Sequence, residues 1–460
     1  MPSRTSACCA PTITPSPTPL GPPSPRSAAR WTACSRSPTC HATKRSPKRR
    51  RRRSSAPSRP VPIQKARRSS TSTTSRSPTS PAMRLVSASR RSETLVAPRT
   101  LNEQDLEALA IGAAILGTGG GGSPYVGRLR AREQLRKGRV IKVIDLEDLD
   151  DEAQVVTVGG IGAPVIGIEK FEKGDECLRA LRAIERVEGR KADALIAAEI
   201  GGANAMEPLL TAAQAGIPVV DADGMGRAFP EVQMCTYYIY GHPPAPAALA
   251  DEKGNTVVLQ HMKDMYWLEK IARTVAVDMG AAAGFAEKPM SGAFVKQYAV
   301  PRTITQAMRL GHVVLDARRE RRNPVDAVAS SERGKRVYDG KITDVRREIV
   351  AGFARGTVKL EGLDTHSGRR AQVEIQNENL ILTVDGEVVA AVPDLIMLLD
   401  QDTGEPITTE VLRYGMRVAI IVMPCHPLLR TPEALAVVGP AAFGYPDVSY
   451  QPMEGDLTHA

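Results

Sequence analysis

The glycine-rich segment GTGGGGSP at residues 117–124 combines residue types that can bind an anion or a polarised carbonyl group. Glycine adopts backbone angles that are closed to other residues and lets a ligand approach the main chain. Ser123 is a favoured N-cap and Pro124 a favoured first helical residue, so a helix should follow near residues 124–137. Free N–H groups and the positive end of that helix would then face a ligand. We predict that substrate is bound by Thr118, Gly119, Gly120, Gly121, Gly122 and Ser123.

Two common phosphate-binding motifs do not fit this segment. A Walker loop closes on Lys followed by Ser or Thr, and no such pair closes the segment. A dinucleotide-binding fingerprint follows a strand, whereas residues 101–116 have the pattern of a helix. The alternative to a binding loop is a flexible turn between two helices. Five glycines in six residues are more than a turn requires.

Two acidic residues and an asparagine lie at the end of a predicted strand at residues 194–200 or shortly after it. Glu199 lies late in that strand, and Asn204 and Glu207 lie where the next helix begins. Ligands of open α/β sheets bind beyond the carboxyl ends of the strands. A carboxylate there can bind a metal ion, or its pKa can be raised so that it serves as an acid or a base. The structural alternative for Glu207 is stabilisation of the helix dipole.

Asp221 and Asp223 come just past the next predicted strand, at residues 217–220. Side chains alternate along a strand, so the two aspartates share a face if the chain is extended there. With Glu199 and Glu207 they would form a cluster of four carboxylates, which could activate water directly or through a divalent metal ion. The alternative is that one of the aspartates caps a turn.

The segment MPCHP at residues 423–427 ends the last strong strand. Adjacent strand residues face opposite ways, so Cys425 and His426 do not form a dyad with each other. One of them could reach the site as a thiolate, a base or a metal ligand, although a lone cysteine is also typical of a small core residue. Lys296 could bind an anionic group of the substrate, although a solvated lysine is the commoner arrangement.

The elements that must position these residues fall into two groups. Helices and strands alternate over residues 101–260, which predicts a layered α/β domain with parallel strand–helix–strand connections. Long helices near 263–279 and 303–318 then precede short strands whose Asp-Gly and Asn-Glu-Asn punctuation predicts hairpins. We predict an N-terminal α/β domain at 99–264 and a C-terminal domain, helical and then β-rich, at 265–460.

The basic charge of the chain is confined to its beginning. Residues 1–99 hold 21 of the 61 Lys and Arg residues and one of the 51 Asp and Glu residues, so the remainder has 40 basic and 50 acidic residues. The folded part is therefore mildly acidic, which argues against nucleic acid as its partner. We predict a disordered tail at residues 1–98. The tail could target the protein to the nucleus or to the mitochondrion. Alternatively, translation starts near Met83 and the upstream residues are not translated.

Composition also bears on the compartment. No segment reaches the roughly 18 apolar residues that span a bilayer, and no secretory signal is present. Of the seven cysteines, four lie within the first 40 residues. The few that remain in the folded part suit a reducing compartment without a disulfide framework. We expect a cytoplasmic protein.

Several of these motifs together resemble the S-methyl thiohydantoin desulfurase family, long known only as a domain of unknown function. The resemblance rests on residues 102–125, on EIGGAN at 199–204, on DADGMGRAFPE at 221–231 and on PCHP at 424–427. It runs from about residue 99 to about residue 447, so it covers the whole predicted folded part. Each motif alone is weak, and the combination is specific to the family.

The resemblance implies a fold of two intertwined domains, an α/β domain and a smaller β-rich domain. It implies removal of sulfur from a thiohydantoin ring to leave a hydantoin, and an association with hydantoinase and oxoprolinase proteins in cyclic-amide catabolism. It supplies no catalytic residue that can be carried over. We also expect a homo-oligomer without membrane partners.

The desulfuration is chemically reasonable for the residues above. The ring carbon that bears sulfur is amidine-like, so water can attack it and methanethiol can leave once a nitrogen is protonated. We assign water activation to the four-carboxylate cluster, with or without a metal ion, and the ring carbonyls to the glycine loop and Asn204. Cys425 or His426 would assist proton transfer. The alternative is a non-catalytic, ligand-binding accessory subunit of a hydantoinase or oxoprolinase complex.

Overall fold

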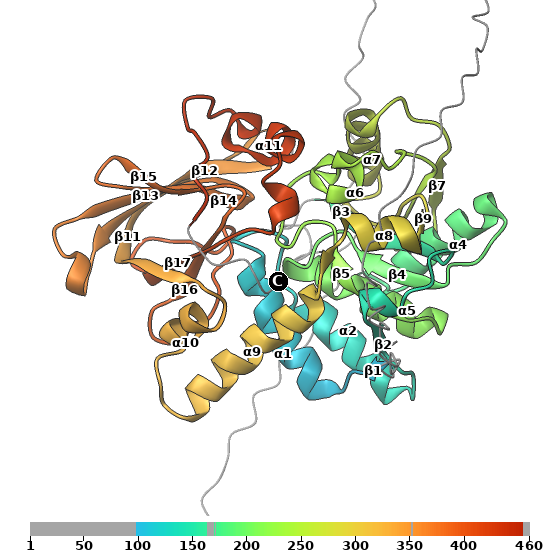
Figure 1. Cartoon of the computed structure of the whole chain (residues 1–460), viewed down its shortest axis with the longest axis horizontal. Helices are drawn as coiled ribbons and strands as arrows, with labels where there is room; N and C mark the ends of the chain where they lie inside the picture. The colour runs from blue at the N-terminus through green and yellow to red at the C-terminus, as the bar shows by residue number, and fades with distance from the viewer. Residues whose placement is uncertain (1–97, 163–169, 171, 351–352, 454–460) are drawn as a thin grey trace, which may run out of the picture. The chain divides into compact units, whose positions relative to one another are not determined.

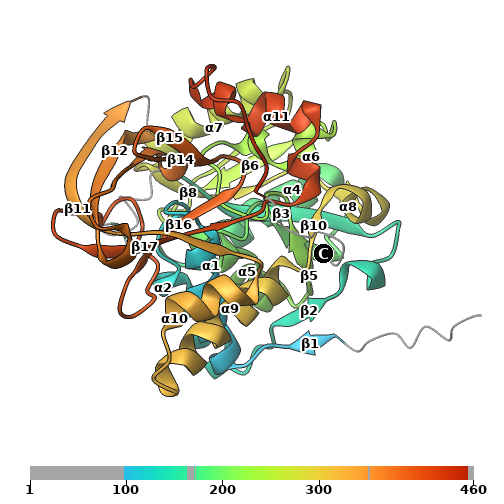
Figure 2. The ribbon, with the colours of Figure 1, turned by 60° about the vertical axis from the view of Figure 1, so that its left-hand side comes forward.

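A ten-stranded mixed sheet organises the first half of the folded chain (Figures 1 and 2). The computed structural model describes residues 98–162, 170, 172–350 and 353–453, so the predicted tail lies almost wholly outside the described residues. The central order β2-β5-β4-β3 is parallel, and antiparallel strands flank it on both sides. The strands are β1 (Arg99–Thr100), β2 (Lys142–Ile144), β3 (Gln154–Gly162), β4 (Ala194–Ala197), β5 (Val219–Asp223), β6 (Ala247–Ala250), β7 (Thr256–Leu259), β8 (Ala282–Ala286), β9 (Met290–Ser291) and β10 (Val300–Pro301).

Helices connect these strands and lead into the second sheet. They are α1 (Glu103–Leu116), α2 (Tyr125–Arg136), α4 (Glu176–Glu188), α5 (Glu207–Ala215), α6 (Thr236–Ile239), α7 (Met265–Asp278), α8 (Gly292–Tyr298), α9 (Thr303–Arg319), α10 (Pro324–Ser331) and α11 (Pro432–Val438). Local sequence explains their ends. Asn102 and Asp105 form a capping box at the start of α1, and Gly216 closes α5 in the left-handed conformation.

The second sheet has seven strands, all antiparallel, in the order β15-β14-β13-β12-β11-β17-β16. The strands are β11 (Lys335–Val350), β12 (Phe353–Gly362), β13 (Arg370–Gln376), β14 (Glu378–Val384), β15 (Glu387–Ala391), β16 (Leu395–Asp400) and β17 (Arg417–Met423). Asp385 and Gly386 have positive φ between β14 and β15, as the predicted Asp-Gly hairpin requires.

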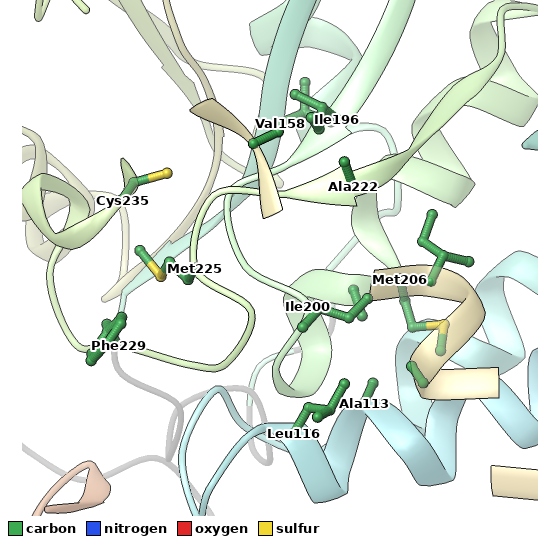
Figure 3. Close-up of a cluster of buried hydrophobic side chains, with 14 of the residues drawn as sticks. Ala113, Leu116, Val158, Ile196, Ile200, Met206, Ala222, Met225, Phe229 and Cys235 are labelled. Atoms are coloured by element: carbon green, nitrogen blue, oxygen red, sulfur yellow. The ribbon is translucent and has the colours of Figure 1, made fainter. Parts of the chain in front are cut away.

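Two separate hydrophobic cores lie on opposite faces of the second sheet. Along β16, Leu395, Met397 and Leu399 belong to the large core shared with the first sheet, whereas Ile396 and Leu398 belong to a second core. This alternation follows from the period of two along a strand. The large core includes Leu116 at the end of α1 and continues to Ile200 and Met225 in the loops after β4 and β5 (Figure 3).

The two parts of the chain are intertwined, as predicted. Strands β8, β9 and β10 follow residue 264, yet they complete the first sheet. Helix α1 also lies against α9 (Figure 2), and glycines make the close approach possible. A Cβ atom on Gly112 would lie 1.7 Å from the Ala307 carbonyl oxygen, and one on Gly311 would lie 1.8 Å from that of Ala108. The predicted fold class, an α/β domain with a β-rich partner, is confirmed.

Most predicted elements occur with small shifts, and two differences have physical causes. Strand β5 runs through Asp223 instead of ending at residue 220, because β10 pairs with its last residues and extends it. The sequence does not predict the 16-residue strand β11, because its many polar and charged residues obscure the alternation of apolar and polar side chains. Pairing with β12 on one side and β17 on the other stabilises this strand.

None of the helices in the described part of the chain combines the length and the apolar character that crossing a bilayer requires.

The α1–α9 contact predicts the effect of a single added methyl group. Gly311→Ala should lower the free energy of unfolding by about 2 kcal/mol, because the overpacking strain exceeds the gain in helix propensity. The neighbouring, exposed substitution His312→Ala should change it by less than about 0.5 kcal/mol. Urea denaturation of both variants tests the prediction, and equal stabilities would contradict the close contact.

Candidate functional site

The glycine loop lies between the two sheets and is shaped by positive φ angles. Thr118, Gly119, Gly121 and Gly122 have φ of 50°, 88°, 69° and 71°. Three backbone N–H groups, from Ala203, Asn379 and Thr409, donate to its carbonyl oxygens at 2.7–2.8 Å. The loop is therefore held by both the first and the second sheet. Within the described residues, the N–H groups of Gly121 and Gly122 have no acceptor, so the loop keeps donors available for a ligand.

Helix α2 begins directly after this loop, as predicted, with one change at its start. Pro124 occupies the N-cap position instead of the first helical position, and the Ser123 Oγ accepts a hydrogen bond from the Tyr125 N–H at 3.4 Å. Ser123 is exposed, whereas Thr118 is fully buried and accepts a hydrogen bond through its hydroxyl group.

The donor to Thr118 is Arg227, which the sequence prediction did not include among the site residues. Arg227 is fully buried, and its Nη2 donates to the Thr118 Oγ1 at 2.8 Å. Its Nη1 donates to the Pro393 and Asp394 carbonyl oxygens at 3.0 and 2.9 Å, and its Nε donates to Ala228 O at 3.0 Å. Burial lowers the pKa of Arg227 to about 10. One side chain thus joins the loop after β5, the glycine loop and the second sheet.

Glu199 lies next to this arginine. Strand β4 ends at Ala197, so Glu199 is in the loop after the strand and not late in the strand, as the sequence predicted. Its Oε1 accepts a hydrogen bond from the Asn204 Nδ2 at 2.8 Å, and its Oε2 accepts one from the Phe229 N–H at 3.2 Å. The side chain is buried, and burial raises its pKa to about 8. The charge of Asp223 raises this pKa further and that of Arg227 lowers it. Glu199 is therefore a carboxyl group that changes protonation near neutral pH.

Asn204 positions Glu199 and is itself fixed by β3. Its Oδ1 accepts a hydrogen bond from the Gly160 N–H at 2.7 Å. The amide thus links the end of β3 to the carboxyl group that follows β4, which leaves it few donors for a ring carbonyl.

Asp223 and Asp221 both serve the local fold. Asp223 accepts hydrogen bonds from the N–H groups of Ile200, Met225 and Gly226 at 2.7–3.1 Å, and burial raises its pKa to about 7. Asp221 accepts a hydrogen bond from the Thr305 N–H at 3.0 Å and so binds the first turn of α9. The turn-capping alternative describes Asp223, whereas Asp221 contacts the first turn of a distant helix.

Glu207 lies in a different group of side chains, around Cys177. Arg130 forms an ion pair with its Oε1 at 3.1 Å, and the Cys177 Sγ lies 3.5 Å from its Oε2. Burial raises the pKa of Glu207 to about 6. The structure thus brings Glu199 and Asp223 together and gives Glu207 and Asp221 separate partners.

The donor set does not suit a divalent metal ion. Among the described residues, no group of three or more His, Cys, Asp or Glu side chains could hold one. The oxygens of Glu199 and Asp223 already accept hydrogen bonds from backbone or amide N–H groups. The predicted four-carboxylate metal cluster therefore does not form from these residues.

Cys425 lies in the second sheet's part of the junction, close to Arg227. Its N–H donates to the Asp394 Oδ1 at 2.9 Å, and its Sγ accepts a hydrogen bond from the Arg430 Nε at 3.4 Å. Burial raises the pKa of the thiol to about 12, so the group is not a thiolate at neutral pH. Tyr450 also donates to the Asp394 Oδ1, at 2.9 Å.

His426 and Lys296 have structural partners away from Glu199. The His426 Nδ1 accepts a hydrogen bond from the Leu428 N–H at 3.3 Å and caps a short 3₁₀ helix, and burial lowers its pKa to about 4. The Lys296 Nζ donates to the exposed Asp151 Oδ1 at 2.8 Å. Strand β17 ends at Met423, so Cys425 and His426 follow the strand and the predicted strand alternation does not apply to them.

A surface groove of about 700 Å³ lies elsewhere, where α9 ends and α10 begins. It contains none of the predicted site residues. Its lining is Arg318, Arg321, Arg322, Pro324, Asp402, Thr403 and Glu405. The groove is open, but the glycine loop and two buried carboxyl groups with raised pKa, Glu199 and Asp223, lie at the junction of the sheets, so we place the site there.

The buried hydrogen bonds of Arg227 predict that its substitution lowers the free energy of unfolding. In Arg227→Lys, the single ammonium group cannot reach all the oxygens that the guanidinium binds, and each buried acceptor left unpaired costs about 1–3 kcal/mol. We expect a loss of about 3 kcal/mol or more in the free energy of unfolding. The exposed substitution Arg319→Lys on α9 is the matched control. A loss similar to that of the control would show that Arg227 does not hold the junction.

The raised pKa of Glu199 predicts how the free energy of unfolding changes with pH. Its pKa is raised from 4.5 to about 8 in the folded protein, so folding favours its protonated form. This contribution is complete below pH 4.5 and is lost as the pH rises towards 8. Glu199→Gln should therefore flatten part of the fall in stability between about pH 5 and 8, which urea denaturation across that range measures. Parallel curves for the two proteins would contradict the raised pKa.

Comparisons with known proteins agree with this architecture. Family models for the S-Me-THD-like N-terminal domain and the S-Me-THD-like C-terminal domain match residues 104–261 and 263–453. A crystal structure of a protein from Chromobacterium violaceum is similar, with a TM-score of 0.64 and 27% identity over 77% of this chain and all of that one. A search of curated proteins finds no match. The chain therefore belongs to the S-Me-THD-like family.

Proposed function

We propose that this protein hydrolyses a thiohydantoin or S-methyl thiohydantoin ring to a hydantoin. The observation that supports this most is Glu199, a buried carboxyl group with a pKa near 8 beside a glycine loop that has free N–H groups. A group of this kind is ionised in part at neutral pH and can accept a proton from water. Family membership supports the substrate class, because the family is named for this activity.

The reaction needs a base, donors to the ring oxygen and a way to protonate the leaving group. In our proposal, Glu199 takes the proton from the attacking water, and Asn204 holds Glu199 in place through its 2.8 Å hydrogen bond. The N–H groups of Gly121 and Gly122 bind a ring carbonyl oxygen and stabilise the charge that develops on the ring. Glu199 is 6% exposed, so substrate must displace part of the surrounding loops to reach it.

This proposal narrows the predicted set of catalytic residues. Asp223 holds the loop after β5 through its backbone hydrogen bonds and raises the pKa of Glu199. Asp221, Glu207, Cys425 and His426 have the partners described above, and the proposal gives them no step in the reaction. It also requires no metal ion.

A release assay tests the proposal directly. The purified chain is incubated with S-methyl thiohydantoin and with the unmethylated thiohydantoin, and the released methanethiol and sulfide are measured with and without a chelator. We expect release that a chelator does not change. Glu199→Gln should lower the rate by about 10²–10⁴-fold, because the base is lost, whereas the exposed control Glu361→Gln should not.

The other outcomes separate the two hypotheses. Release that stops with the chelator would contradict metal-independent activation of water. Binding of either compound without release would instead support the accessory-subunit alternative, in which the protein holds a hydantoin-like ligand for a hydantoinase or oxoprolinase.

A further inference from the structure

Glu378, at the start of β14, is a buried acid that the sequence analysis did not single out. Its side chain is 2% exposed, and its Oε2 has no hydrogen-bond partner among the described residues. A buried oxygen left unpaired is destabilising, so this carboxyl group requires an explanation. The explanation must come from what surrounds it.

The backbone before Glu378 is fixed so that its side chain points to the glycine loop. Asn377 has φ of 58°, its N–H donates to Ala354 O at 2.8 Å, and its Oδ1 accepts from the Ala354 N–H at 2.9 Å. The Thr409 hydroxyl donates to Asn377 O at 2.5 Å. On the other side of Glu378, the Asn379 N–H donates to the carbonyl oxygen of Thr118 at 2.8 Å.

The glycine loop is shaped around this carboxyl group. A Cβ atom on Gly120 would lie 2.0 Å from the Glu378 Oε1, so a side chain at this position would force the Glu378 carboxyl group to move. The glycine at this position therefore allows the Glu378 carboxyl group to approach the loop. An acid in such a place is tolerated most easily when it is protonated.

Glu378 and Glu199 influence each other although they belong to different sheets. Burial raises the pKa of Glu378 well above 4.5, the charge of Glu199 raises it further, and the charge of Arg227 lowers it. Asp223, at the end of β5, and Arg227, in the loop after it, are the charged groups that act on Glu199, and Glu410 acts on Glu378. A charge on one of two neighbouring buried carboxyl groups disfavours ionisation of the other.

We propose that Glu378 and Glu199 form a catalytic carboxyl pair across the two sheets, in which Glu378 is the proton donor and Glu199 the proton acceptor. The unpaired Oε2 of Glu378 is then the atom that meets the substrate. The chemical roles in this inference rest on the proposed function. The pairing of the two carboxyl groups does not depend on that function.

The proton transfers balance over one turnover with the S-methyl substrate. Water adds to the ring carbon that bears sulfur while its proton passes to Glu199, and Glu378 protonates the adjacent ring nitrogen. The carbon–sulfur bond then breaks, and the thiolate takes the proton from Glu199 and leaves as methanethiol. The new hydroxyl group returns its proton to Glu378 as it becomes the hydantoin carbonyl, so both carboxyl groups regain their starting states.

Two measurements on the full chain test the pair. Glu378→Gln should lower methanethiol release by at least about 100-fold, whereas Glu387→Gln, an exposed change at the start of β15, should leave it unchanged. Carboxyl ¹³C NMR should show Glu378 titrating above Glu199, with the resonance assigned by its loss in Glu378→Gln. In Glu199→Gln the Glu378 titration should move to lower pH.

The outcomes separate this inference from the proposed function. If the natural sequence releases methanethiol and folded Glu378→Gln retains activity within threefold, Glu378 is not the proton donor. If the natural sequence releases nothing, the proposed function is wrong, and the NMR titration still decides whether the pair exists. A Glu378 titration that Glu199→Gln does not move would overturn the pair.

Discussion

The buried guanidinium group of Arg227 is the interaction on which the candidate site depends. It carries a charge in the interior and donates to oxygens of the glycine loop, the loop after β5 and the second sheet. A buried charge of this kind is tolerated only when its donors are satisfied, so these segments must keep their relative positions. The positive charge also limits how far the pKa values of Glu199 and Glu378 can rise. Arg227 therefore determines both the arrangement of the segments at the junction and the electrostatic environment of its carboxyl groups.

Close approach of backbones is the second constraint, and glycine provides it in two places. Gly112 and Gly311 let α1 and α9 touch, which ties the start of the folded chain to the connection between the sheets. Gly120 lets the glycine loop meet the carboxyl group of Glu378. The glycine-rich segment is thus explained by packing against the second sheet as much as by its free N–H groups, a combination that neither a phosphate loop nor a simple turn would require.

Much of the fold could be predicted from the sequence, because local signals specify it. The capping residue Asn102, the glycine after α5 and the Asp-Gly hairpin act within a few residues of each other. The site was harder to predict, because its members meet only through long-range packing. Glu199 was identified from its position at the end of a predicted strand, whereas Glu378 lies at the start of a strand in the other sheet. The only local signal near Glu378 is the Asn-Glu-Asn segment, which indicates a turn. That segment does not indicate that Glu378 lies near Glu199.

The central claim is that a carboxylate activates water for direct attack on the ring carbon. A single turnover in H₂¹⁸O, with enzyme in excess over S-methyl thiohydantoin and the product analysed by mass spectrometry, tests it most directly. Direct attack predicts one ¹⁸O atom in the hydantoin from the first turnover. Product that carries only ¹⁶O in that turnover would show that a protein carboxyl group attacked the ring itself, and would contradict the role given to Glu199.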